Sequence, residues 1–212
     1  MIFYWLMHYL GKILMFPFLG VVYPLKILGK KNMPKNKKII MVCNHLSFVD
    51  VLQVWVRTPG WRRFLAKDEV GKSLARPFVK ATGTIFVNRD GNDMKAVRKC
   101  IAVLGKGQGL NIFPEGTRNK SHEDLQELQR GVAMFAIKTG ATIVPINILH
   151  KSKAFCKNYL SFGTPFTLVQ FEGIANRQNT EQGTQMIFEA MQQAKQNTMQ
   201  FLQDKGNTEM QA

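Results

Sequence analysis

Short, largely apolar segments recur along the chain, and glycine, proline or polar residues follow each of them. Residues 38–43 are the clearest example, because a β-branched run bounded by polar residues is typical of a buried strand. Similar segments lie at residues 61–67, 83–89, 110–113, 143–149 and 159–162. We therefore expect a sheet built from these segments.

Helical patterns separate the predicted strands. One helix should begin near Phe48, and another should follow Asn92 or Asp93 as its cap and end near Gly105. Two more helices are expected at residues 129–138 and 185–203. The second is amphipathic and should pack its apolar face on the rest of the domain. Strands that alternate with helices predict a single α/β domain with a largely parallel sheet flanked by helices.

Size and charge restrict the class of protein. A chain of 212 residues suits one domain with a substantial core. The formal net charge of +15 requires an anionic partner such as nucleic acid, acidic lipid or a phosphate-bearing substrate. The three cysteines, Cys43, Cys100 and Cys156, form neither a disulfide framework nor a metal-spaced pair, and indicate a reducing compartment.

The amino-terminal residues 1–28 are nearly all apolar and rich in aromatic side chains, which favours membrane contact over a core helix. No small-residue cleavage site follows, so a removable secretory signal is not expected. Lys12 and Pro17 divide the run, and a spanning helix needs about 20 consecutive apolar residues. We expect two short helices that enter one leaflet and return; a single tilted span from about residue 2 to 23 is the alternative.

A basic stretch, residues 30–38, follows this apolar segment. It suits the anionic cytoplasmic leaflet, although a solvated linker would also be rich in lysine. We therefore expect residues 1–29 to form a membrane-associated helical segment at the cytoplasmic face of the cell membrane. Residues 30–212 would form the α/β domain.

The turn after the first predicted strand carries His45 and, five residues later, Asp50. On one continuous helix these two would face apart, so His45 should lie in the turn with Asp50 reaching back from the helix. A carboxylate on one imidazole nitrogen leaves the other free as a general base for a substrate hydroxyl. A capping or core histidine is the alternative, and a zinc site would lack most of its ligands.

Two further turns also end strands in polar residues. Arg89 ends the 83–89 segment, and residues 115–118 follow the 110–113 segment. Because the carboxyl ends of strands line one crevice in an open α/β sheet, these groups could converge with His45. Arg89, Arg118 and Lys67 would suit a phosphate, although each arginine taken alone is more often in a surface salt bridge.

Four blocks of sequence resemble the ordered motifs of the glycerolipid acyltransferases, in particular the bacterial 1-acyl-sn-glycerol-3-phosphate acyltransferase family. They are Asn44-His45-x-Ser47-x-x-Asp50, Gly83-x-Ile85-Phe86-Val87-x-Arg89, Phe113-Pro114-Glu115-Gly116-Thr117-Arg118 and Val144-Pro145-Ile146. The basic-basic-Gly stretch of that family is Gln129-Arg130-Gly131 here, so one basic residue is missing. This departure leaves details of the acceptor open.

The resemblance implies transfer of a fatty acyl group from an acyl carrier protein or coenzyme A thioester to the 2-hydroxyl of lysophosphatidate. His45 would deprotonate that hydroxyl, and Asp50 would orient the imidazole. Arg89 and Arg118, with Lys67, would hold the acceptor phosphate, while Glu115, Gly116 and Thr117 would shape its pocket. No metal or bound cofactor is expected. Glycerol 3-phosphate and other lysophospholipids are the alternative acceptors.

Two other classes of protein compete with this interpretation. A basic nucleic-acid-binding protein would explain the net charge, but no recognised motif is present and the aromatic residues cluster in the apolar amino terminus. A non-catalytic peripheral membrane module would not need the intact pair His45 and Asp50. We therefore expect no nucleic-acid partner, and an anionic lipid surface instead.

Overall fold

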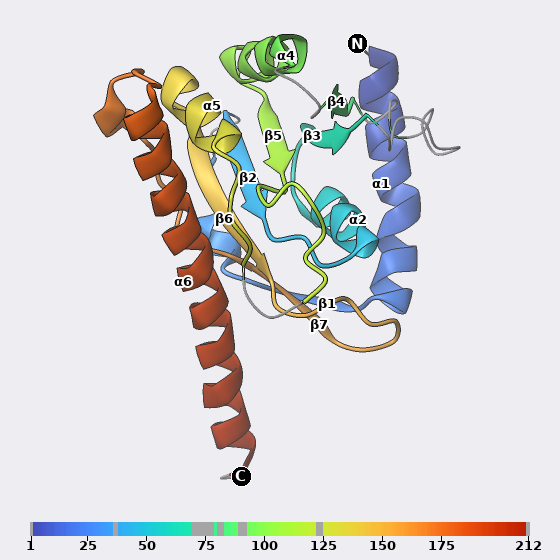
Figure 1. Cartoon of the computed structure of the whole chain (residues 1–212). Helices are drawn as coiled ribbons and strands as arrows, with labels where there is room; N and C mark the ends of the chain where they lie inside the picture. The colour runs from blue at the N-terminus through green and yellow to red at the C-terminus, as the bar shows by residue number, and fades with distance from the viewer. Residues whose placement is uncertain are drawn as a thin grey trace.

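A sheet with strand order β1-β7-β6-β2-β5-β3-β4 forms the centre of the molecule (Figure 1). The computed structural model describes residues 2–35, 38–68, 79, 83–88, 93–121 and 125–210. The strands are β1 (Leu25–Leu28), β2 (Ile39–Cys43), β3 (Arg62–Lys67), β4 (Ile85–Val87), β5 (Gly109–Ile112), β6 (Thr142–Ile148) and β7 (Asn158–Phe162). All neighbouring pairs are parallel except β6 and β7. This confirms the predicted α/β class with a largely parallel sheet.

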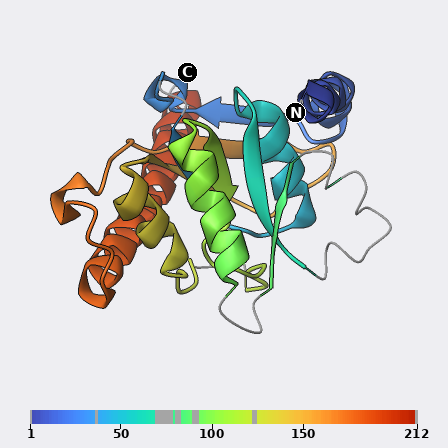
Figure 2. The same cartoon turned by 90° about the horizontal axis from the view of Figure 1, so that it is seen from above.

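Helices cover both faces of the sheet, as Figures 1 and 2 show. They are α1 (Ile2–Val22), α2 (Phe48–Arg57), α4 (Met94–Gly105), α5 (Gly131–Thr139) and α6 (Arg177–Met210), and short 3-10 turns span Lys30–Asn32 and Val169–Phe171. One core cluster joins α1 and α2 to the sheet, and the other joins α4, α5 and α6 to its opposite face. Strand β2 lies between the two clusters and is buried at every residue, which explains its continuous apolar sequence.

The predicted strands are all present, and one further strand was missed. Strand β1 lies inside the segment that we expected to be membrane-associated, because its four residues pair in parallel with β7. The sheet therefore begins before residue 29. Of the two predicted caps of α4, Asp93 is the one that caps it: its carboxylate accepts the Ala96 N–H at 3.0 Å. Helix α6 begins earlier than predicted and packs through Ile187, Met191 and Ala194.

Helix α1 runs unbroken through Pro17, so the prediction of two short helices is wrong. A proline removes one hydrogen bond and disfavours the helix locally. Here Lys12, before the proline, bonds to Thr58 at the end of α2, and Leu19, after it, is buried in the core. These contacts on the same α/β domain hold the two halves of the helix in line. Residues 5–22 of α1 are long and apolar enough to cross a membrane by length and composition alone.

One face of α1 is docked along most of its length. His8 accepts a hydrogen bond from the Trp55 indole N–H at 3.1 Å, and the Lys12 ammonium donates to the carbonyls of Thr58 and Gly60 at 2.8 and 3.1 Å. Gly11 lies against the Trp55 ring so closely that an added Cβ would stand 2.6 Å from it. The opposite face is apolar and exposed, through Trp5, Leu6, Leu10, Ile13, Leu14, Phe16, Phe18 and Val21.

Candidate active site

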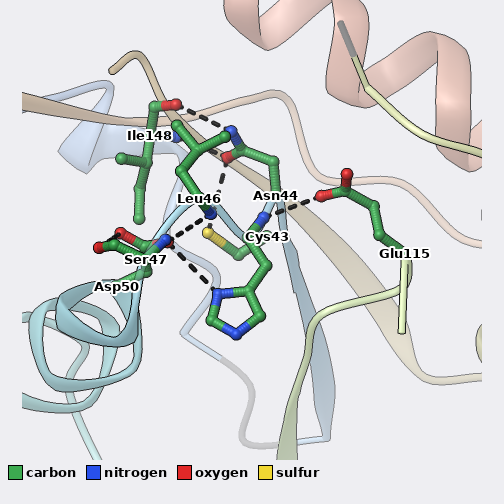
Figure 3. Close-up of polar contacts among 8 residues, drawn as sticks. Cys43, Asn44, Leu46, Ser47, Asp50, Glu115 and Ile148 are labelled. Atoms are coloured by element: carbon green, nitrogen blue, oxygen red, sulfur yellow. Dashed lines mark hydrogen bonds and ion pairs between the residues drawn. The ribbon is translucent and has the colours of Figure 1, made fainter. Parts of the chain in front are cut away.

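The turn that follows β2 is fixed to the neighbouring strand by Asn44. Its side-chain amide donates to the Ile148 carbonyl and its oxygen accepts the Ile148 N–H, both at 2.8 Å (Figure 3). This pair of bonds continues the β2–β6 ladder by one residue through a side chain. The main chain is therefore held where it leaves the sheet, directly before His45.

Asp50 organises the turn from the first turn of α2. Its Oδ2 accepts the main-chain N–H groups of Leu46 and Ser47, both at 2.6 Å, and its Oδ1 accepts the Ser47 hydroxyl at 2.9 Å (Figure 3). Ser47 is the N-cap residue and Asp50 the third residue of the helix, so the carboxylate also faces the positive end of the helix dipole. These donors compensate the burial of a carboxylate that has no exposed surface.

His45 lies within reach of this carboxylate. Its Nδ1 is 3.3 Å from Asp50 Oδ2, a long hydrogen bond of the kind found in catalytic sites without substrate. The ring stacks on Phe113, with centroids 4.2 Å apart, and the side chain keeps 16% of its surface exposed. With its proton on Nδ1, the imidazole presents Nε2 as the basic nitrogen.

Glu115 holds the His45 turn from the other side. Its Oε1 accepts the His45 main-chain N–H at 2.8 Å (Figure 3), and its Oε2 accepts the Gln126 N–H at 3.2 Å. Burial raises the pKa of Glu115, and these two hydrogen bonds oppose the rise. Gly116 follows with φ of 74°, a conformation that favours glycine, in a turn closed by its N–H to the Phe113 carbonyl. The hydrogen bonds of Glu115 are thus internal to the protein.

The predicted phosphate-binding residues are less closely grouped. Thr117 and Arg118 are exposed on the loop next to Glu115. Lys67 is exposed at the end of β3, two strands from β2 and therefore roughly 10 Å along the sheet. Arg89 lies outside the described residues. The structure thus brings His45, Asp50 and Glu115 together and places Thr117 and Arg118 beside them.

The Ser47 hydroxyl and the Cys43 thiol, the potential nucleophiles nearest to His45 in the sequence, are occupied or neutral. The Ser47 hydroxyl donates to Asp50, and burial, with the charges of Asp50 and Glu115, raises the pKa of the Cys43 thiol. Over the described part of the chain, no three His, Cys, Asp or Glu side chains gather as metal ligands would. The arrangement suits a general base that activates an external hydroxyl.

Some residues that shape the site were not among the predicted site residues. Asn44 and Ser47 stand in the first sequence block, and Phe113 begins the third, but their contacts depend on partners distant in sequence. Asn119 is buried, and its N–H donates to the His45 carbonyl at 2.7 Å. Its position one residue beyond the third block was the only indication in the sequence.

Comparison with known proteins agrees with this geometry. The sequence model of the acyltransferase family matches residues 24–149, which include the whole His45 turn, Glu115 and β6. The chain belongs to the acyltransferase family. The match covers more than half of the chain, and α1 and α6 lie outside it.

Curated members of this acyltransferase family from several organisms are similar to the chain. A 1-acyl-sn-glycerol-3-phosphate acyltransferase of Borreliella burgdorferi is 33% identical over 63% of this chain and 54% of its own length. A protein of the same name from Bacillus subtilis is 30% identical over 57% of this chain and 60% of its own. The chain thus spans only about half of the length of such relatives.

A solved structure has the same fold. The 1-acyl-sn-glycerophosphate acyltransferase from Thermotoga maritima superposes with a TM-score of 0.66 over 92% of this chain and 79% of that one, at 21% sequence identity. At 21% identity, this similarity shows a shared fold and no more. It includes regions of the chain beyond residues 24–149.

Proposed function

We propose that this acyltransferase moves a fatty acyl group from a thioester to the sn-2 hydroxyl of 1-acyl-sn-glycerol 3-phosphate, giving phosphatidate. The observation that carries the proposal is the pair formed by His45 Nδ1 and the buried Asp50 carboxylate, 3.3 Å apart. The names of the similar proteins from Borreliella burgdorferi and Bacillus subtilis support this acceptor.

The reaction follows from the chemistry of the pair. His45 Nε2 takes the proton of the acceptor hydroxyl, and Asp50 stabilises the imidazolium that forms. The oxygen attacks the thioester carbonyl, the carbon–sulfur bond breaks, and the leaving thiolate regains a proton. Because Ser47 and Cys43 are not available as nucleophiles, the transfer is direct and forms no covalent enzyme intermediate.

The phosphate of the acceptor would meet the cations near the His45 turn. Arg118 is exposed on the loop that follows Glu115, next to the His45 turn. Lys67 and Arg89 are the other phosphate-binding residues that the sequence predicts. A charge-assisted contact with phosphate is typically worth about 1.5 to 3 kcal/mol. Acyl carrier protein and coenzyme A are the two candidate donors, and no metal or bound cofactor takes part in the proposed reaction.

The same proposal places the enzyme on the cytoplasmic face of the membrane, because both the proposed acceptor and its product are lipids. The exposed apolar face of α1 would lie in the lipid surface, while its other face stays docked on α2. Of the basic stretch, residues 30–35 and Lys38 are described, and Lys38 lies directly before the amino end of β2, at the opposite end of the strand from His45. Their contact with anionic lipid stays a prediction.

The decisive experiment follows labelled acyl transfer by the purified chain. Each thioester donor is tested with detergent-dispersed lysophosphatidate, glycerol 3-phosphate and other lysophospholipids, and phosphatidate and free thiol are measured. His45→Ala should lower the rate by about 10² to 10⁴-fold, since the general base is lost. Lys138→Ala, which removes an exposed side chain of α5, is the control. Near-normal activity of His45→Ala would overturn the mechanism, and transfer only to another acceptor would overturn the substrate.

A further inference from the structure

The loop that connects β6 and β7, residues 149–157, holds an aromatic side chain out into solvent. Phe155 is 76% exposed, the highest value among the large apolar residues of the described chain. Its φ is 57°, in the left-handed region that a bulky residue rarely adopts and that costs roughly 1 to 2 kcal/mol. Packing in the core therefore does not explain a residue whose backbone is strained and whose side chain is largely exposed.

This β6–β7 loop is fixed rather than loosely attached. The Asn158 side chain accepts the Lys153 N–H at 3.0 Å and donates to the carbonyls of Lys153 and Cys156 at 3.1 and 2.8 Å. It also donates to the Pro24 carbonyl at 3.3 Å, and Asn158 itself is buried. The loop is thus tied to the chain that leaves α1.

Phe155 lies at the carboxyl end of α1. Its main-chain N–H donates to the Val22 carbonyl at 2.6 Å, which satisfies one of the last carbonyls of the helix. Figure 1 shows the β6–β7 loop beneath this end of α1, and Figure 2 shows the same neighbourhood from above. The loop therefore lies next to the carboxyl end of α1, where Phe18 and Val21 are 54% and 70% exposed.

The charge of the loop is uniformly positive. Lys151, Lys153 and Lys157 are exposed and form no ion pair with any described residue. The sequence contains no aspartate or glutamate between Glu127 and Glu172. Lysines around an exposed aromatic ring match an anionic lipid surface, since each basic residue near such a surface adds about 1 kcal/mol to binding.

We infer that the β6–β7 loop is a second membrane contact, in which Phe155 enters an anionic lipid surface and the three lysines meet its head groups. The inference rests on the proposed membrane position of α1. Because β6 ends next to Asn44, this contact would bring the His45 end of the sheet to the lipid. With α1 it gives two separate points of attachment, which together fix how the active site faces the membrane.

Cys156 provides a natural reporter for this contact. It is exposed, whereas Cys43 and Cys100 are buried and burial raises the pKa of both thiols. A polarity-sensitive dye on Cys156 should shift to the blue when vesicles of phosphatidylcholine and phosphatidylglycerol are added, and spin-labelled lipid should quench it. The same dye in a Val169→Cys, Cys156→Ser protein is the control, because Val169 is 63% exposed and its neighbours Leu168 and Phe171 pack with α4, α5 and α6 rather than with α1.

Two variants separate the aromatic from the charged contribution. Phe155→Asn removes the ring with a residue that tolerates φ of 57°, and should weaken vesicle binding roughly tenfold or more; Val169→Asn should not. Replacing Lys151, Lys153 and Lys157 by glutamine should weaken binding to anionic vesicles by about fivefold per lysine. The control replaces Lys95, Lys99 and Lys106, exposed lysines of α4 and its carboxyl end.

The outcomes distinguish this inference from the proposed function. If the protein binds vesicles but the Cys156 dye stays in water, the loop is not a membrane contact although α1 is. Equal losses in the loop variants and their controls would overturn the inference too, as would a chain that binds no vesicles at all. If the dye enters the lipid while no acyl transfer is found, the loop contact stands and the proposed activity fails.

Discussion

Asp50 has two tasks in the candidate site, one structural and one chemical. Its carboxylate gathers the N–H groups of Leu46 and Ser47 and so shapes the turn, and the same oxygen faces His45. A residue of this kind connects stability to activity, because the geometry of the base depends on the cap of α2. Changes at Asp50 and at Ser47 should therefore affect both properties, but to different degrees.

Asp50→Asn should lower the rate severely and destabilise the protein by about 1 to 3 kcal/mol. The amide has one acceptor instead of two, so its NH₂ group would oppose a main-chain or hydroxyl donor that the carboxylate now accepts. It also cannot stabilise an imidazolium. Urea unfolding and acyl-transfer rates measure the two effects.

Ser47→Ala is the matched comparison, because it removes the N-cap side chain and keeps the Asp50 carboxylate. It should cost about 1 kcal/mol of stability and much less activity than Asp50→Asn. Equal losses of activity in the two variants would contradict the assignment of Asp50 to the chemistry.

The sequence predicted a contact in the site correctly where the two residues are close together in the chain. Helix geometry was enough to place Asp50 beside His45, which is only five residues away. The inward-facing bond of Glu115 could not be predicted, because its partner is a main-chain N–H separated by 70 residues. Phe113 and Asn119 were missed for the same reason.

At the scale of elements, the attachment of α1 depends on an uncharged histidine. His8 is buried beneath Trp55 and accepts its indole N–H. Burial, then the nearby charges of Lys12 and Arg62, lower the pKa of His8 to about 4. No carboxylate is among the groups that affect this pKa, so protonation would place a third cation beside the other two.

The stability of the protein should therefore decrease in mild acid. An unfolded histidine takes a proton near pH 6.5 and the folded one only near about 4, so this contribution is present above about pH 6.5 and is lost as the pH falls toward about 4. Between about pH 7 and about pH 5 the expected loss is about 2 kcal/mol. Urea unfolding followed by tryptophan fluorescence measures it, and His8→Gln should show a flatter pH dependence. Identical slopes would contradict the role of His8.

Some helices and strands could be predicted from their own sequence, and others depend on contacts with distant residues. Strands β2 and β6 were predictable from continuous β-branched runs buried on both faces. Strand β1 was not, because it is a short part of a longer apolar segment and its partner, β7, lies over 100 residues away. The continuity of α1 through Pro17 likewise depends on the bond of Lys12 to Thr58 before the proline and on the burial of Leu19 after it, which no local rule for proline includes.

At the scale of the whole molecule, the docking of α1 decides how the chain can meet a membrane. The contacts from His8 to Leu19 extend over 12 residues, or roughly 17 Å of helix. A helix that crossed the bilayer in this position would carry the buried guanidinium of Arg62 into hydrocarbon, and its Nε and Nη1 have no hydrogen-bond partner among the described residues. Groups of this kind are costly there unless they are paired. The free face of α1 can meet lipid without that cost if the helix lies along the surface.

We therefore predict that the amino terminus stays on the cytoplasmic side. In bacterial cells expressing a Phe3→Cys, Cys156→Ser protein, a membrane-impermeant thiol reagent should label position 3 only after the cells are permeabilised. A Val169→Cys, Cys156→Ser protein is the control, because its exposed cysteine should behave in the same way. A spanning α1 would place residue 3 outside while the α/β domain stays within, so labelling of intact cells at position 3 but not at position 169 would refute the surface orientation. Protection of both positions, together with vesicle binding by the purified chain, is the result expected of a helix that rests in one leaflet.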